Sequence, residues 1–185
     1  MTKAQLTVLA GPTAVGKGTV VAALTKRYPA LKVSVSATTR DPRPGELNGV
    51  HYYFVSPQEF DAMIERGDML EWALVHGKNK YGTPRGPVDE ALNAGHPVLL
   101  EIDLAGARQV RANRPEAQFI FLAPPSWEEL QRRLIGRGTE GPEEQARRLA
   151  TARVELQAAS EFDHVVINDD VERAVDELAR LIGLE

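Results

Sequence analysis

Gly11-Pro-Thr-Ala-Val-Gly-Lys-Gly-Thr19, directly after the apolar run Leu6–Ala10, is the stretch that decides the fold of this 185-residue chain. A strand, a loop bounded by glycines and then a helix form the arrangement that cradles phosphate groups. Gly11 and Gly16 let backbone amides turn inward, and Lys17 adds a positive charge beside the positive end of the helix dipole. A glycine turn that binds nothing is the alternative, but the flanking strand and helix favour a phosphate site.

The bulk composition excludes several classes of partner. Acidic residues outnumber basic ones, 26 to 22, so the net charge of −4 argues against nucleic acid or an acidic membrane surface. The chain has no cysteine, which excludes disulfides and thiolate metal sites and fits a reducing, cytoplasmic location. We find no secretion signal, no membrane span and no metal-ligand spacing among the four histidines, and we expect no metal cluster.

Strands alternate with helices along most of the chain. Apolar runs predict strands at 6–10, 97–103, 117–123 and 164–168, and an alternation of apolar and polar residues predicts a strand with one buried face at 31–36. Helical patterns lie at 20–27, 84–95, 105–113 and 171–182. A further helix opens at the capping box 126–129, and a long helix that follows it ends at about residue 160. This alternation predicts an α/β fold with a doubly wound parallel sheet.

The composition changes between residues 36 and 83, where turn formers and short strands replace long apolar runs. His51–Val55 and Met69–Val75 are predicted strands, and Ser56-Pro-Gln-Glu59 is a capping box that opens a helix. We therefore expect residues 36–83 to form a small, mostly antiparallel insert with one helix. It has little aliphatic material of its own, so we expect it to move against the core.

Two arginines stand in a stiff loop at the start of this insert. Pro42 and Pro44 restrict the backbone around Arg40 and Arg43, so both guanidinium groups lose little entropy on gripping one anion. Tyr52 and Tyr81 are candidates to donate phenolic hydrogen bonds to the same anion. The alternatives are a solvated charged loop and two half-buried packing tyrosines.

Glu71 interrupts an otherwise apolar strand. Its carboxylate is suited to accept two hydrogen bonds from a ligand edge with two adjacent donors, such as N1–H and the N2 amine of guanine. Adenine has a lone pair at N1, and a site built this way discriminates by about 10⁴-fold. The alternative is a charge that faces solvent on an antiparallel strand, which is the usual case without further context.

The chain resembles the guanylate kinase family from end to end. The motifs that carry the resemblance are Gly11-Pro-Thr-Ala-Val-Gly-Lys17, Ser34-Val-Ser-Ala-Thr-Thr-Arg40, Pro42-Arg-Pro-Gly-Glu46, Leu70-Glu-Trp72, Tyr81-Gly-Thr83, Ile102-Asp-Leu-Ala-Gly106, Ala123-Pro-Pro-Ser126, Gly136-Arg-Gly-Thr-Glu140 and Val166-Ile-Asn-Asp169. The motifs from Ser34 to Glu46, leading into an Asn-Gly turn, are the specific ones. The resemblance implies a core of 1–35, 84–132 and 150–185, a GMP-binding insert of 36–83 and a helical lid of 133–149.

The resemblance also implies transfer of phosphate from ATP to GMP with Mg²⁺, by a monomer or a homodimer, and a set of site residues. The ATP phosphates would contact Gly11, Pro12, Thr13, Ala14, Val15, Gly16, Lys17, Gly18 and Thr19, with Asn168 at the adenine and Mg²⁺ near Thr19. Phosphate of GMP would bind Arg40, Arg43, Tyr52 and Tyr81. Guanine would meet Ser36, Glu71 and Thr83, with Glu46, Glu101 and Asp103 close by. Catalysis would use Lys17, Arg40 and the lid arginines Arg133, Arg137 and Arg148.

Three positions depart from the commonest family pattern. Gly18 replaces the hydroxyl that usually follows the lysine, Ala14 stands where glycine is frequent, and His51 stands where an acid is frequent.

Three other functions compete with this one. They are a scaffold domain that binds phosphopeptides, a kinase for AMP or UMP, and a phosphate-loop hydrolase. Lys17 argues against the first and Glu71 against the second, and the insert is unexplained in the third.

Overall fold

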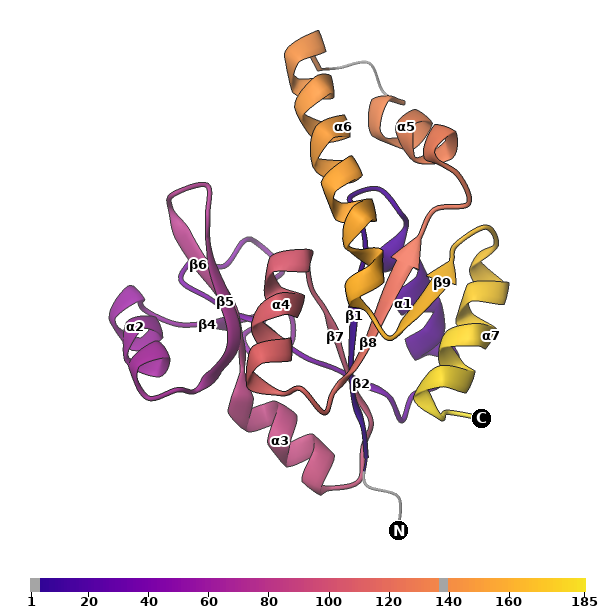
Figure 1. The fold of residues 1–185 in the computed structure, drawn as a ribbon. Coiled ribbons are helices and arrows are strands. Elements are labelled where there is room, and N and C mark those ends of the chain that lie inside the picture. The colour runs from indigo at the N-terminus through magenta and orange to yellow at the C-terminus, as the bar shows by residue number, and fades with distance from the viewer. Residues whose placement is uncertain (1–3, 137–139) are drawn as a thin grey trace.

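A computed structural model describes residues 4–136 and 140–185, and its centre is a five-stranded parallel sheet (Figure 1). The strand order is β2-β7-β1-β8-β9. The strands span Leu6–Ala10 (β1), Lys32–Val33 (β2), Val98–Glu101 (β7), Gln118–Ala123 (β8) and His164–Ile167 (β9). Because neighbouring strands are not consecutive in the sequence, helical crossovers connect them, as a doubly wound sheet requires.

Helices cover both faces of this sheet, which confirms the predicted fold class. One face packs against α1 (Lys17–Arg27) and α7 (Val171–Ile182), and the other against α3 (Arg85–Asn93) and α4 (Leu104–Asn113). Beyond the carboxyl end of the sheet, α5 (Trp127–Ile135) and α6 (Pro142–Gln157) pack on each other. A single 3₁₀ turn, η1 (Ala158–Glu161), continues α6 toward β9.

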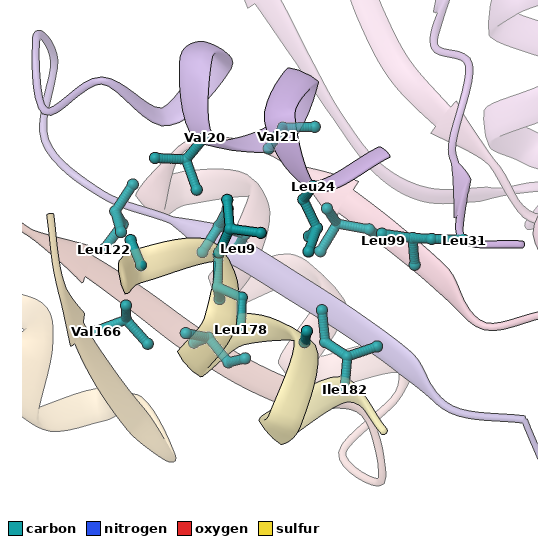
Figure 2. Close-up of a cluster of buried hydrophobic side chains, with 14 of the residues drawn as sticks. Leu9, Val20, Val21, Leu24, Leu31, Leu99, Leu122, Val166, Leu178 and Ile182 are labelled. Carbon is teal, nitrogen blue, oxygen red and sulfur yellow. The ribbon is translucent and has the colours of Figure 1, made fainter. Parts of the chain in front are cut away.

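The largest apolar cluster lies between the sheet and its α1/α7 face. Leu9 of β1 is fully buried there with Leu24 of α1 and Leu178 of α7. Figure 2 shows the side chains of these three elements converging with those of neighbouring strands. Strand residues adjacent to Leu9, such as Val8, point to the opposite face and join the cluster beneath α3 and α4. Burial on both faces explains why the core strands are continuous apolar runs.

The insert is a separate four-stranded sheet with one helix. Its strand order is β4-β3-β6-β5, with β3 parallel to β4 and antiparallel to β6, and β6 antiparallel to β5. The elements span Ala37–Thr38 (β3), Tyr53–Phe54 (β4), Pro57–Glu65 (α2), Met69–Val75 (β5) and Asn79–Pro84 (β6). Ser56 caps α2 by accepting the Glu59 N–H at 3.0 Å, so the predicted helix start is confirmed, while the Glu59 carboxylate accepts a hydrogen bond from Arg66.

Several predicted elements are shorter than expected, among them the strand predicted at 51–55, which is reduced to the two residues of β4. The strand predicted at 31–36 is reduced to β2, because the last bond to the core sheet is from the Ser34 N–H to Leu99 and the next strand, at Ala37–Thr38, pairs in the insert sheet. Alternation of apolar and polar residues cannot reveal which sheet a residue joins. The helix expected to reach about residue 160 tightens into η1 after Gln157. No helix among the described residues is long and apolar enough to cross a membrane.

We expect Leu178→Ala to lower the free energy of unfolding by about 3 kcal/mol, because it removes a fully buried side chain and leaves a cavity. Urea unfolding followed by circular dichroism measures this loss. Leu74→Ala is the matched control, because Leu74 is 55% exposed and its truncation should change stability by less than about 0.5 kcal/mol. Equal losses in the two variants would contradict the assignment of the core.

Candidate functional site

The glycine-bounded loop joins β1 to α1 and encloses a pocket. The cavity has a volume of about 330 Å³ and is lined by Gly11, Pro12, Thr13, Ala14, Val15, Gly16, Lys17 and Gly18 together with Glu101, Asp103 and Glu155. Gly16 has φ of +93°, which a glycine adopts without strain, and α1 begins at the next residue. The first amides of α1 therefore have no partner within their own helix and open into this pocket.

Ala14 also adopts a left-handed backbone conformation, with φ of +69°. This is the position at which glycine is frequent in the resembling family, and the observed φ explains why. The alanine bears a strain of about 1 kcal/mol. Its methyl group packs against the apolar cluster of α5 and α6, so it links the loop to these two helices.

Lys17 reaches across the pocket to the end of β7. Its Nζ donates a hydrogen bond to the carbonyl oxygen of Ile102 at 3.0 Å. Burial lowers the pKa of Lys17, while the nearby carboxylates of Glu101, Asp103 and Glu155 act in the opposite direction. The ammonium group is therefore desolvated but surrounded by negative charge in the absence of a ligand, and an incoming anion would meet an already positioned cation.

The loop is held from outside by two side chains that bind the same carbonyl group. The carbonyl oxygen of Val15 accepts hydrogen bonds from Asn168 Nδ2 at 2.8 Å and from Arg133 Nη1 at 3.2 Å. A Cβ at Gly16 would lie 2.7 Å from Asn168 Nδ2, so the close approach depends on glycine there. Asn168 thus supports the loop backbone, a contact that its sequence motif alone did not suggest.

A second cluster forms on one face of the insert sheet. Arg40 makes two hydrogen bonds to Glu46, at 2.9 and 3.0 Å, and its guanidinium group lies 5.2 Å from the centre of the Tyr52 ring and 6.0 Å from that of Phe54. The bond from Arg40 holds the pKa of Glu46 at about 2. The Tyr81 ring lies 6.0 Å from that of Tyr52. Arg40 is thus fixed by a carboxylate and by aromatic rings before any ligand binds.

Glu71 is buried, with 8% of its surface exposed, so the alternative of a solvent-facing charge is wrong. Its Oε1 accepts a hydrogen bond from the Thr83 hydroxyl at 2.8 Å, across the β5–β6 pair. Burial raises the pKa of Glu71, and the charge of Asp103 raises it further, although the Thr83 bond lowers it. Ala73 faces Tyr81 in the same register, so Glu71, Thr83 and Tyr81 share one face of the sheet.

Other predicted site residues lie apart from these clusters or are engaged elsewhere. Arg148 pairs with Glu140 at 2.6 Å, and Arg43 is exposed, with its backbone N–H bonded to Glu46. Ser36 offers its backbone carbonyl to Tyr53, and Thr19 is exposed in the first turn of α1. Arg137 lies outside the described residues. The sequence pattern did not suggest Glu155 or Phe54, because both reach their clusters only through tertiary packing.

Sequence comparisons with known proteins lead to one family. The guanylate kinase family model matches residues 3–185. A guanylate kinase of Leifsonia xyli subsp. xyli is 62% identical over 177 residues, which cover 96% of this chain and 70% of that protein. A guanylate kinase of Streptomyces coelicolor is 60% identical over 180 residues, which cover 97% of this chain and 91% of that protein.

Solved structures give the same result for the fold. The crystal structure of guanylate kinase from Anaplasma phagocytophilum matches with a TM-score of 0.72 and 33% identity, covering 97% of this chain and 85% of that chain. A shikimate kinase from Bacteroides thetaiotaomicron matches with a TM-score of 0.51 at 14% identity, covering 97% and 98% of the two chains. The second likeness shows the shared fold alone.

We expect Gly16→Ala to raise the dissociation constant of a nucleotide triphosphate by at least about 10-fold, because the new Cβ is strained at positive φ and collides with Asn168. Titration calorimetry with ATP measures the effect. Gly86→Ala is the control, since its Cβ would meet nothing within 4 Å and its φ is not positive. Unchanged affinity in the Gly16 variant would show that the loop geometry does not govern binding.

Proposed function

Because the chain belongs to the guanylate kinase family and transfers the γ-phosphate of ATP to GMP, giving ADP and GDP, we propose a residue-by-residue division of that work. The glycine-bounded loop and Lys17 bind the phosphates of ATP. The cluster around Arg40 binds the phosphate of GMP, and Glu71 reads its base. ATP and GMP bind within a single chain, which suits a monomer or a homodimer in a reducing cytoplasm.

The observation that carries this proposal is the buried carboxylate of Glu71 beside Thr83. A buried carboxylate with one oxygen bonded to a hydroxyl needs further donors to remain charged. The N1–H and N2 amine of guanine supply two donors side by side, whereas N1 of adenine would direct a lone pair at it. The Arg40 cluster lies along the same sheet face, where the phosphate of a nucleotide bound at Glu71 would reach it. Ser36, Arg43, Tyr52 and Tyr81 complete this binding surface.

The ATP end is supported by the pocket at the loop. Its amides and Lys17 suit the triphosphate, and Arg133 is already bonded to the loop backbone from α5. Arg137 and Arg148 would reach the transferring phosphate when the lid, residues 133–149, closes. Asn168 would touch adenine from beneath the loop with the part of its side chain that does not hold Val15.

Mg²⁺ is implied by the ATP-dependent reaction, and the donors at this pocket fit it. The side chains that line the pocket beyond the loop are the carboxylates of Glu101, Asp103 and Glu155, and oxygen ligands are the ones Mg²⁺ prefers. Within residues 4–136 and 140–185, no group of three or more histidine or acidic side chains is arranged to hold a metal alone. The ion would therefore rest mainly on phosphate oxygens, with Thr19 nearby, and would neutralise charge that develops during transfer.

The reaction itself needs positioning more than proton transfer. A phosphate of GMP is already ionised near neutral pH, so no general base is required. The two nucleotides repel each other, and separate cations must neutralise each one: Lys17 for the donor and Arg40 for the acceptor. We propose that the insert, residues 36–83, and the lid close over the core, residues 1–35, 84–132 and 150–185. Closure would exclude water, the competing acceptor.

The sharpest test of this division is Glu71→Gln, because the variant keeps the shape of the side chain and removes its charge. We expect kcat/KM for GMP to fall by about 100-fold or more, with KM for ATP unchanged, since buried donors of guanine would lose an ionic acceptor. Release of ADP from Mg-ATP, with GMP, AMP, UMP and CMP offered in turn, measures it. Wild-type preference for GMP retained in full by the variant would remove Glu71 from recognition.

We expect substitutions of Arg40 and of Lys17 to change different kinetic constants. Arg40→Ala should raise KM for GMP strongly, by about 100-fold, because an anion loses a fixed guanidinium group. Lys17→Ala should mainly lower kcat, because its charge acts on the transferring group. Steady-state kinetics with each substrate varied in turn measure both. Arg85→Ala is the control, because Arg85 is the first residue of α3 and its side chain donates to the Gly67 carbonyl oxygen. The assigned roles would be refuted if Arg40→Ala left KM for GMP unchanged and Lys17→Ala left kcat unchanged.

A further inference from the structure

The strand that carries Glu71 lies at the edge of the insert sheet. β5 pairs with β6 on one side, and on its other side helix α4 of the core lies alongside it (Figure 1). The backbone groups on that outer side have no strand partner, and an edge strand left in this state can slip or twist. The register between β5 and β6 shifts between Met69 and Glu71, so the backbone is irregular at the residue that matters for the base.

Two side chains of α4 take the place of the missing strand. Gln109 uses both ends of its amide on one residue: its Oε1 accepts the Trp72 N–H at 3.0 Å, and its Nε2 donates to the Trp72 carbonyl oxygen at 2.9 Å. Asn113 Nδ2 donates to the carbonyl oxygen of Leu70 at 3.0 Å. The residues on either side of Glu71 are therefore both tied to α4 through their backbones.

A third residue of α4 lies against the carboxylate itself. A Cβ at Gly106 would lie 3.1 Å from Glu71 Oε2 and 3.1 Å from Asp103 Oδ1, a distance at which a neighbour must move. The glycine therefore lets the carboxylate approach the first turn of α4, where the helix dipole is positive. Asp103 caps the same turn by accepting the Gly106 N–H at 2.8 Å. Gly106 thus permits the position of Glu71 that Gln109 and Asn113 hold.

These residues recur at a spacing of three and four, so they form one face of α4. Burial anchors the same region, because Leu70 is fully buried in the core cluster with Ala107 and Val110 of α4. Trp72, two residues after Leu70, packs instead in the apolar cluster of the insert. Glu71 therefore lies between Leu70, which packs in the core, and Trp72, which packs in the insert.

We propose that the α4 face of Gly106, Gln109 and Asn113 is a specificity-determining surface, which positions the Glu71 carboxylate for the two adjacent donors of guanine. This inference rests on the proposed role of Glu71. A carboxylate that accepts two parallel hydrogen bonds depends on alignment, and a displacement of about 1 Å costs up to about 100-fold in rate. The surface therefore controls the advantage of GMP over an acceptor that lacks the N2 amine, such as IMP.

The test compares kcat/KM for GMP with kcat/KM for IMP in Gln109→Met, which keeps the length of the side chain and removes its hydrogen bonds. We expect the GMP-to-IMP ratio to fall by about 10-fold, with KM for ATP within about 2-fold of the wild type. Gly106→Ala should lower the ratio further, because its Cβ displaces the carboxylate directly. Arg108→Met is the matched control: it introduces the same side chain at the preceding position, where Arg108 pairs with Glu161 instead.

Stability and specificity are separated by two further measurements. Thermal unfolding of each variant sets an assay temperature at which all are folded. Asn113→Ala removes one hydrogen bond from an exposed side chain, so it keeps the test open if Gln109→Met does not fold. If the bonds of Gln109 and Asn113 to β5 serve stability alone, their removal lowers the unfolding temperature and leaves the GMP-to-IMP ratio of kcat/KM unchanged in the folded enzyme. That result would overturn the inference.

Glu71→Gln, assayed in the same series, separates this inference from the function on which it rests. A lower ratio in Glu71→Gln with a wild-type ratio in both Gln109→Met and Asn113→Ala would refute the α4 surface and keep Glu71 as the reader of the base. A wild-type ratio in Glu71→Gln would overturn both. A lower ratio in all of these variants, with Arg108→Met unchanged, would support the surface.

Discussion

Electrostatic repulsion between two phosphorylated nucleotides is the constraint on which this structure depends. Because the chain has a net charge of −4, no general excess of positive charge attracts the nucleotides, and individual cations at the two clusters must do so. Both cations lie beside carboxylates: Lys17 is among three acids at the pocket and donates a hydrogen bond to the Ile102 carbonyl oxygen, and Arg40 donates two hydrogen bonds to Glu46. These internal anions keep the cations charged and oriented, and the nucleotides meet sites that need little reorganisation.

Helix α4 connects the two halves of the site. Its cap, Asp103, acts on the charge of Lys17 at the pocket and on that of Glu71 at the insert. One turn later, Gly106 lets Glu71 approach, and Gln109 holds the backbone beside it. The phosphate loop and the Glu71 carboxylate are therefore connected through a single helix, although the two lie on different sheets.

Most of the fold follows from local patterns. The five core strands and the helices around them were predictable because strands buried on both faces are continuous apolar runs, and because serine caps and glycines mark the helix ends. The strands predicted at 31–36 and 51–55 shrink to the two-residue β2 and β4, and β3 was not predicted, since two paired residues carry no periodicity and their sheet is chosen by partners far away in the sequence. The bulge beside Glu71 belongs to the same class, because only β6 reveals it.

For the site, the sequence by itself determined which chemistry is available: a loop for phosphates, an arginine-bearing stiff loop and one carboxylate within an apolar strand. These are properties of residue type and spacing, which do not depend on the rest of the chain. Only the tertiary structure decided that Glu71 is buried, that Asn168 and Arg133 share the carbonyl of Val15, and that Glu155 faces Lys17. Burial and long-range hydrogen bonds depend on which surfaces meet, and residues more than a hundred positions apart carry no local trace of their contact.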